Sequence, residues 1–277
     1  MKEWFMIIKI DHIAISTPYI ENAIQYFHKL GYATEFLLPQ VKNSEIKKPF
    51  LSHFSETHNV SLLLKNKCFS IELLDHGQLS ETQSFMIPVF ESFPYPLNKN
   101  EQIVLTSSTQ LFRSYIDELD IWAYVKYNLD ECFIFNTIVF KTPSIEASFQ
   151  FWTHFGFKPQ ELTETYAKLE FKTPFNRYPF YIILTKDKTN CTSKKMYLNS
   201  NGFSYMAFIT NSDESEKKRL IGNALNVTQT DTIDVNNKRL NIFFVKGPCN
   251  EFVEIISLVK PDRTIHENER RNKNNND

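Results

Sequence analysis

The sequence predicts an α+β protein built from four tandem βαβββ modules, of which the second is shortened. Three observations support this fold class. A segment near the N-terminus recurs in the middle of the chain, and the same order of strand and helix patterns reappears in two other segments. In addition, the 277 residues include 25 phenylalanines and only 6 glycines, a composition typical of sheets with thick apolar faces.

The internal repeat is the strongest of these observations. Residues 9–32 align with residues 134–157 at a constant offset of 125. A match of this kind indicates one structural unit used twice. The identical pairs are Ile13/Ile138, Thr17/Thr142, Pro18/Pro143, Ile20/Ile145, Glu21/Glu146, Gln25/Gln150 and Gly31/Gly156.

Each copy has the pattern of a strand, a helix and further strands. The opening run is apolar and rich in β-branched residues, which predicts a strand. The Thr-Pro pair that follows predicts a helix start, with Thr17 and Thr142 as N-caps and proline in the first turn. Gly31 and Gly156 predict the helix ends. The later strands are expected at Val60–Leu64, Phe69–Leu74, Ala167–Lys172 and Tyr181–Thr185.

Two weaker units complete the chain. Residues 202–258 predict a full module, with strands at Phe203–Thr210, Asn241–Val245 and Glu251–Leu258 and a helix at Glu214–Ala224. Residues 84–128 predict the shortened module, with strands at Gln102–Thr106 and Trp122–Tyr127 and a helix at Gln110–Leu119.

We therefore expect two halves with a boundary near Cys132. The N-terminal half, residues 1–131, would hold the modules at 8–76 and 84–128. The C-terminal half, residues 132–260, would hold those at 133–186 and 202–258. The tail, residues 261–277, is charged and rich in asparagine, which predicts disorder.

Composition excludes several classes of function. The formal net charge is −1, which argues against nucleic acid as a partner because phosphate binding needs a basic surface. No apolar run is long enough to span a membrane. The 4 cysteines stand singly, so a zinc ribbon is excluded and the cytoplasm is the expected compartment.

Three groups of residues carry a family resemblance. The run DHIAISTPYIENAIQYFHKLGY resembles the opening of methylmalonyl-CoA epimerase and glyoxalase relatives, and HNVSLLL with SIELLDHG resembles the close of the same module. GFSYMAFIT and EFVEIISL resemble the last module of two-domain extradiol dioxygenases. Over about residues 8–260 the chain thus resembles the vicinal-oxygen-chelate superfamily. The resemblance implies two glyoxalase-like half-domains with cupped mixed sheets, in which the first and last strands of the modules supply metal ligands.

Within this resemblance His12 stands at the first-strand ligand position and Glu72 at the last-strand position. Strand alternation places His12 on one face with Ile10 and Ala14. A carboxylate inside a strand is costly unless it is paired or binds a metal. The alternatives are a hydrogen-bonded core histidine and a glutamate that is exposed or ion-paired.

The other modules match the ligand pattern less well. Gln102 is the nearest match for a third metal ligand, with a surface glutamine as the alternative. In the C-terminal half only Glu254 matches, and we regard Glu72 and Glu254 as the candidate catalytic carboxylates. Extradiol dioxygenase activity is not expected, because its iron needs two histidines and one carboxylate. The remaining ligand positions of the C-terminal half carry Thr137, Ile183 and Tyr205. His53, His58 and His76 lie near strand ends of the first module.

Two principal functions follow from the resemblance. One is a metal-assisted isomerase, epimerase or lyase for a small carbonyl or acyl substrate, with one divalent ion (Zn, Ni, Co, Mn or Fe). The other is a small-molecule-binding protein of the bleomycin-resistance type, which needs no metal. A degenerate member without catalysis is a third reading. A homodimer is a further expectation, because sheet edges in this superfamily often pair across subunits.

Overall fold

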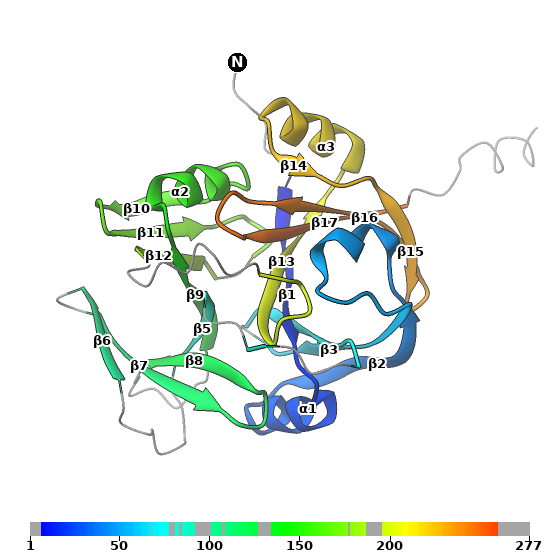
Figure 1. Cartoon of the computed structure of the whole chain (residues 1–277), viewed down its shortest axis with the longest axis horizontal. Helices are drawn as coiled ribbons and strands as arrows, with labels where there is room; N and C mark the ends of the chain where they lie inside the picture. The colour runs from blue at the N-terminus through cyan, green and yellow to red at the C-terminus, as the bar shows by residue number, and fades with distance from the viewer. Residues whose placement is uncertain are drawn as a thin grey trace, which may run out of the picture.

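Two mixed β-sheets and a few short helices make up the protein (Figure 1). This is the α+β class that the sequence predicts. The computed structural model describes residues 7–66, 68–77, 81–82, 85–91, 101–106, 109–126, 134–176, 178–186 and 196–259. The predicted disorder of the tail concerns residues outside these ranges.

One sheet has nine strands and combines the two ends of the described chain. Its strands are β1 (Ile7–Ser16), β2 (Ala33–Lys42), β3 (Thr57–Leu64), β4 (Ser70–Asp75), β13 (Gly202–Thr210), β14 (Asn226–Val227), β15 (Asp231–Val235), β16 (Lys238–Lys246) and β17 (Phe252–Leu258). Their order is β14-β16-β17-β13-β1-β4-β3-β2, and β15 pairs with β16.

The other sheet has eight strands from the middle of the chain. They are β5 (Met86–Glu91), β6 (Glu101–Thr106), β7 (Thr109–Ile116), β8 (Ile121–Lys126), β9 (Ile134–Thr142), β10 (Lys158–Leu162), β11 (Tyr166–Phe171) and β12 (Phe180–Lys186). Their order is β10-β11-β12-β9-β5-β8-β7-β6.

The modules pair differently from the way their order along the chain suggests. β1 pairs antiparallel with β13, and β5 pairs antiparallel with β9. The first module therefore shares its sheet with the fourth, and the second with the third. The expected halves, 1–131 and 132–260, do not describe the sheets, because β8 and β9 on either side of that boundary belong to one sheet. Modules are visible in a sequence, but the partner that each one chooses is not.

The second module is less shortened than the sequence predicts. In every module the first strand runs parallel to the last, and β5 and β8 follow this rule as β1 and β4 do. The predicted helix Gln110–Leu119 is wrong: β7 occupies most of that segment and pairs with both β6 and β8. Cross-strand pairing in a sheet overrides a helical spacing of apolar residues. Residues 92–100, between β5 and β6, lie outside the described part.

The three α-helices follow the sequence closely at their C-terminal ends. They are α1 (Ile20–Lys29), α2 (Ile145–Thr153) and α3 (Asp213–Gly222). Gly31 and Gly156 have φ angles of 86° and 91°, the left-handed conformation that ends a helix and favours glycine.

The predicted N-caps are misplaced. The N-cap of α2 is Ser144, whose Oγ accepts a hydrogen bond from the backbone N–H of Ala147 at 3.2 Å. α1 begins after Tyr19 without a side-chain cap. Thr17 and Thr142 accept hydrogen bonds from backbone N–H groups just before the helices, so each Thr-Pro pair forms the turn that leads into a helix.

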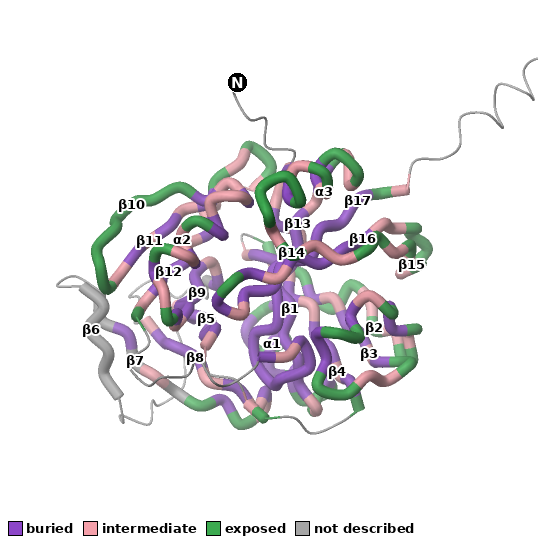
Figure 2. Tube along the Cα trace, turned by 45° about the horizontal axis from the view of Figure 1, so that its top comes forward, coloured by how far each residue is buried: buried purple, intermediate pink, exposed green. Residues whose placement is uncertain are grey.

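A continuous apolar core joins the helices to both sheets. It includes Ile13 of β1, Phe27 of α1 and Trp152 of α2, all fully buried. Buried backbone accordingly runs through the centre of both sheets (Figure 2). Strand alternation directs His12 to the opposite face from Ile13; we call this the inner face of the nine-stranded sheet. No helix in the described ranges is both long and apolar enough to cross a membrane.

A short 3-10 helix, η1 (Glu45–Phe50), lies in the connection between β2 and β3. It contacts β16 and lies within the curve of the nine-stranded sheet (Figure 1). The sheet and η1 together enclose the polar side chains described next.

Candidate metal centre

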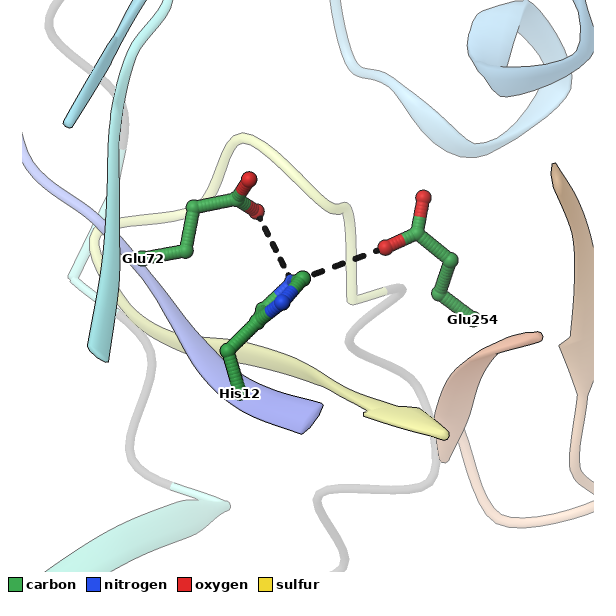
Figure 3. A group of neighbouring side chains, drawn as sticks. All are labelled: His12, Glu72 and Glu254. Carbon is green, nitrogen blue, oxygen red and sulfur yellow. Dashed lines mark ion pairs between the residues drawn. The ribbon is translucent and has the colours of Figure 1, made fainter. Parts of the chain in front are cut away.

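Three ligand-type side chains converge on the inner face of the nine-stranded sheet. They are His12 on β1, Glu72 on β4 and Glu254 on β17. His12 Nε2 lies 3.2 Å from Glu72 Oε2 and 3.6 Å from Glu254 Oε2, so the imidazole points between the two carboxylates (Figure 3). One ligand atom from each residue lies within 4.8 Å of the others.

Strand register explains this convergence. His12 lies opposite Ala207 and Ala207 lies opposite Glu254, so His12 and Glu254 share a face across β13. Glu72 lies opposite Ala14, two residues after His12. Because side chains two residues apart point the same way in a strand, Glu72 joins the same face.

The contact of His12 Nδ1 with Asp11 determines which tautomer the neutral imidazole adopts. Nδ1 lies 3.2 Å from Asp11 Oδ2, and donation of its proton to that carboxylate leaves a lone pair on Nε2. Nε2 is buried and has no well-aligned hydrogen bond to any described residue, although both glutamates are near. A buried ring nitrogen that faces two carboxylates is an arrangement that a cation, either a proton or a metal ion, would complete.

The electrostatics of the cluster agree with its geometry. Burial alone would lower the pKa of His12, but the nearby carboxylates of Glu72, Asp11 and Glu254 raise it well above its ordinary value. Burial would raise the pKa of Glu72, but His12, Lys47 and Tyr205 hold it well below its ordinary value. In the absence of a cation the cluster is thus ionic, with a proton where a metal would otherwise bind.

The donor set fits a divalent metal ion. One imidazole nitrogen and two carboxylate oxygens suit Zn, Mn, Fe, Co or Ni. Bonds of about 2.0–2.2 Å would hold the ligand atoms about 3–3.5 Å apart, and the measured separations from His12 Nε2 are 3.2 and 3.6 Å. Asp11 supplies the hydrogen bond that metal-binding histidines commonly make. His12, Glu72 and Glu254 would hold the ion.

Aromatic side chains and a lysine close the site. The Tyr205 hydroxyl donates a 2.7 Å hydrogen bond to Glu72 Oε2, and burial followed by the charges of both glutamates raises the pKa of Tyr205 well above its ordinary value. The Tyr205 ring packs edge-on against Phe244 at 5.3 Å. The ammonium of Lys47, on η1, lies over both rings.

Comparison with solved structures identifies the fold. A point mutant of glyoxalase I from Zea mays is 12% identical, with 90% of this chain and 92% of that chain covered at a TM-score of 0.59. A Bacillus subtilis protein whose name proposes a dioxygenase is 10% identical, with coverage of 92% and 86% and a TM-score of 0.58. The chain has the vicinal-oxygen-chelate fold. Neither a protein-family model nor a curated protein sequence matches the chain. The resemblance of the first module to methylmalonyl-CoA epimerase stays a prediction.

The vicinal-oxygen-chelate arrangement unites residues that the sequence assigns to different halves. His12 and Glu72 come from the first module and Glu254 from the fourth, and they meet because these modules share a sheet. Tyr205 stands beside them on β13, and its hydroxyl donates to Glu72. Gln102 is not part of this group, because β6 is the edge strand of the other sheet.

The remaining histidine candidates occupy two places. His53 is exposed in the loop after η1. His58 and His76 are buried, and their rings stack at 5.3 Å with an interplanar angle of 16°. Burial, with the charge of Lys47, lowers the pKa of His58 to about 2 and that of His76 to about 3. Both histidines are therefore neutral at physiological pH.

Lys47 is the site residue that sequence reasoning missed. It belongs to the run EIKKPF, in which two adjacent lysines have the pattern of a solvated surface. Only the folded chain shows that Lys47 is buried while Lys48 is exposed. The 3-10 geometry of η1 turns one of the two inward.

Proposed function

We propose that the inner face of the nine-stranded sheet binds one divalent metal ion through His12, Glu72 and Glu254. On this basis the protein is a metal-assisted isomerase, epimerase or lyase that acts on a small carbonyl or acyl compound. The observation that carries the proposal is the buried Nε2 of His12, which faces two carboxylates and is backed by Asp11.

When bound, a divalent ion polarises a substrate carbonyl and stabilises the negative charge that develops on its oxygen. Residues of the chain would position the ligands and transfer the proton. Tyr205 holds Glu72 through its 2.7 Å hydrogen bond. No described residue forms a hydrogen bond with Glu254 Oε1, so this oxygen is the better carrier of a proton removed beside the carbonyl. η1 lies within the curve of the sheet, where it would limit the access of water to the inner face.

The first test is the metal content of untagged protein. Near-stoichiometric divalent metal is expected in the wild type, and loss is expected in His12→Ala and Glu72→Ala, since each removes a ligand. His28→Ala is the matched control, because His28 is exposed on α1. A wild type that binds no Mn, Fe, Co, Ni or Zn after incubation with excess ion would refute the metal centre.

The second test concerns proton transfer. Metal-loaded protein should catalyse exchange of the α-hydrogen of small ketones, aldehydes or acyl thioesters with deuterium from D₂O, followed by NMR. At saturating metal, Glu254→Gln should lose this exchange, because an amide cannot accept the proton. Unchanged exchange in Glu254→Gln would assign the proton carrier elsewhere.

A metal-free binding protein of the bleomycin-resistance type is the second candidate. The observation that favours it is the aromatic wall of Tyr205 and Phe244, with Tyr205 at the place of a fourth ligand. In that case His12→Ala should retain ligand affinity, whereas Phe244→Ala should weaken it.

The donor set of one histidine and two carboxylates also differs from that of an extradiol dioxygenase.

A further inference from the structure

Lys47 places a buried positive charge beside the proposed metal centre. Lys47 is only 6% exposed. Its Nζ lies 5.8 Å from the centre of the Tyr205 ring and 5.5 Å from that of the Phe244 ring. The ring of His12 approaches the same tyrosine at 6.2 Å. Within the described ranges no carboxylate lies within 4 Å of Nζ and no hydrogen bond satisfies it. A buried ammonium without a paired anion is costly.

Anchors on both sides hold η1 in place. Ser44, just before η1, hydrogen-bonds Asp231 of β15. At the other end, Leu198 N donates to Phe50 O at 2.8 Å, and Ser52 N donates to Asn199 Oδ1 at 2.9 Å. Lys47 is therefore held over the inner face by contacts to two distant parts of the chain.

His58 and His76 add unsatisfied hydrogen-bonding groups near Lys47. His58 Nδ1 and both ring nitrogens of His76 are buried without a hydrogen-bond partner in the described part of the chain. The β3–β4 register pairs Asn59 with Asp75, so the next pair outward is His58 with His76. His58 lies on β3 and His76 directly follows β4, so both continue the inner face beyond Glu72. The effect of Lys47 on the pKa of both rings agrees with its proximity.

We propose that Lys47, His58 and His76 form an anion subsite that binds the carboxylate of the substrate. The inference rests on the proposed metal centre and names its substrate class: a small carbonyl compound that carries one carboxylate. A neutral imidazole can donate one N–H, and the ammonium supplies charge-assisted donors. All three side chains have donor groups without a described hydrogen-bond partner, and an oxyanion would accept from them.

The charge of the site supports a single negative charge on the ligand. A divalent ion balances Glu72 and Glu254, Lys9 balances Asp11 through their ion pair, and His12 is neutral when it binds metal. Lys47 then leaves one net positive charge in a buried site. A monocarboxylate neutralises this charge, whereas a neutral ligand leaves it uncompensated. Without the metal the two glutamates would repel an anion, so carboxylate binding should depend on metal.

The test compares 2-oxo acids with their neutral amides on the full chain. Pyruvate and 2-oxobutanoate, each paired with its amide, are titrated calorimetrically into protein loaded with the ion that the metal assay identifies. The acids should bind at least about tenfold more tightly than the amides, the size expected for a charge-assisted hydrogen bond. Removal of the metal should abolish this preference.

Lys47→Met should reduce the acid-to-amide ratio to near one and leave metal content and amide affinity unchanged. Lys48→Met is the matched control, since Lys48 is the exposed neighbour on η1, and it should keep the wild-type ratio. Wild-type protein that holds metal but binds acids no better than amides, or binds neither, would overturn the subsite alone. So would an unchanged ratio in Lys47→Met. Wild-type protein without metal would overturn the subsite and the proposed function together.

Discussion

The two sheets have the same strand register but different chemistry at equivalent positions. In each, the first strands of two modules pair antiparallel at the centre, and each module's last strand lies parallel to its first. The four inner-face positions of the nine-stranded sheet hold His12, Glu72, Tyr205 and Glu254. The register places their counterparts in the eight-stranded sheet at Thr137, Ile183, Ile87 and Tyr124.

Three of the counterparts, all except Thr137, belong to a small apolar cluster. It is separate from the main core, and its buried members are Ile87, Val89, Leu111, Tyr124, Val139 and Ile183. Here the sheet packs apolar side chains where the other sheet gathers ionisable ones. One backbone geometry thus serves packing in one place and, as we propose, metal binding in the other. The fold permits a metal centre at either sheet, and a few side chains decide which has it.

The difference has an energetic consequence. The apolar cluster stabilises the fold through removal of its side chains from water. The polar cluster must offset the desolvation of His12, Glu72 and Glu254 through their mutual attraction, which seldom exceeds the cost of burial. We therefore expect the eight-stranded sheet to carry more of the stability, and the nine-stranded sheet to keep its charges for function.

The largest effect should come from a carboxylate placed in the apolar cluster. Ile183→Glu copies Glu72 into the equivalent position, but Thr137 stands there in place of the histidine and Ile87 in place of Tyr205. Loss of the apolar side chain and burial of a carboxyl without these two partners should lower the free energy of unfolding by on the order of 3 kcal/mol. Urea denaturation at pH 7 measures this. Ile183→Val is the volume control and should cost about 1 kcal/mol. Equal losses in the two variants would contradict the comparison.

A smaller effect is expected from the residue behind His12. Asp11→Asn keeps the shape of the side chain and removes the charge that orients the imidazole. Affinity for the divalent ion should fall about 10- to 100-fold, the range found when such outer partners are removed. Metal titration against a competing chelator measures it. Lys9→Met is the control, because Lys9 meets the other oxygen of Asp11 from the solvent side. An unchanged affinity in Asp11→Asn would mean that Asp11 does not orient the imidazole.

The sequence predicts the modules well because their signals are local. The repeat places β1 and β9, the apolar periodicity places α1 and α2, and the two glycines place the helix ends. The prediction of a helix at Gln110–Leu119 was wrong because this segment forms β7. Its pairing with β6 and β8 depends on contacts that the local pattern of residues does not show. The pairing of modules one and four was invisible for the same reason.

The candidate site shows the same difference between local sequence signals and contacts between distant residues. His12, Glu72 and Glu254 are each identifiable, because a polar residue at a fixed position of a strand contrasts with its apolar neighbours. Their meeting in one site was not predictable, because Glu72 and Glu254 lie far apart along the chain. Gln102 was chosen because the second module was taken as the partner of the first. Lys47 carried no signal, because burial of one lysine among two depends on the path of η1 over the sheet.

The stability of the nine-stranded sheet should also depend on pH through two buried histidines. His58 and His76 are buried in their neutral forms, and burial followed by the charge of Lys47 lowers their pKa values to about 2 and about 3. In the unfolded chain both bind a proton near pH 6.5. Between that pH and about 3 the unfolded state therefore holds more protons, and the free energy of unfolding falls as pH falls. Each histidine contributes a slope of up to about 1.4 kcal/mol per pH unit.

His76→Leu should remove about that slope between pH 6 and pH 4, as measured by urea denaturation at each pH. His28→Leu is the control, because His28 is exposed on α1, and it should keep the wild-type slope. If His76→Leu left the slope intact, the histidine pair would already be charged in the folded protein. The pair would then offer the anion subsite cationic donors in place of neutral ones, and the single positive charge inferred for the site would be too low.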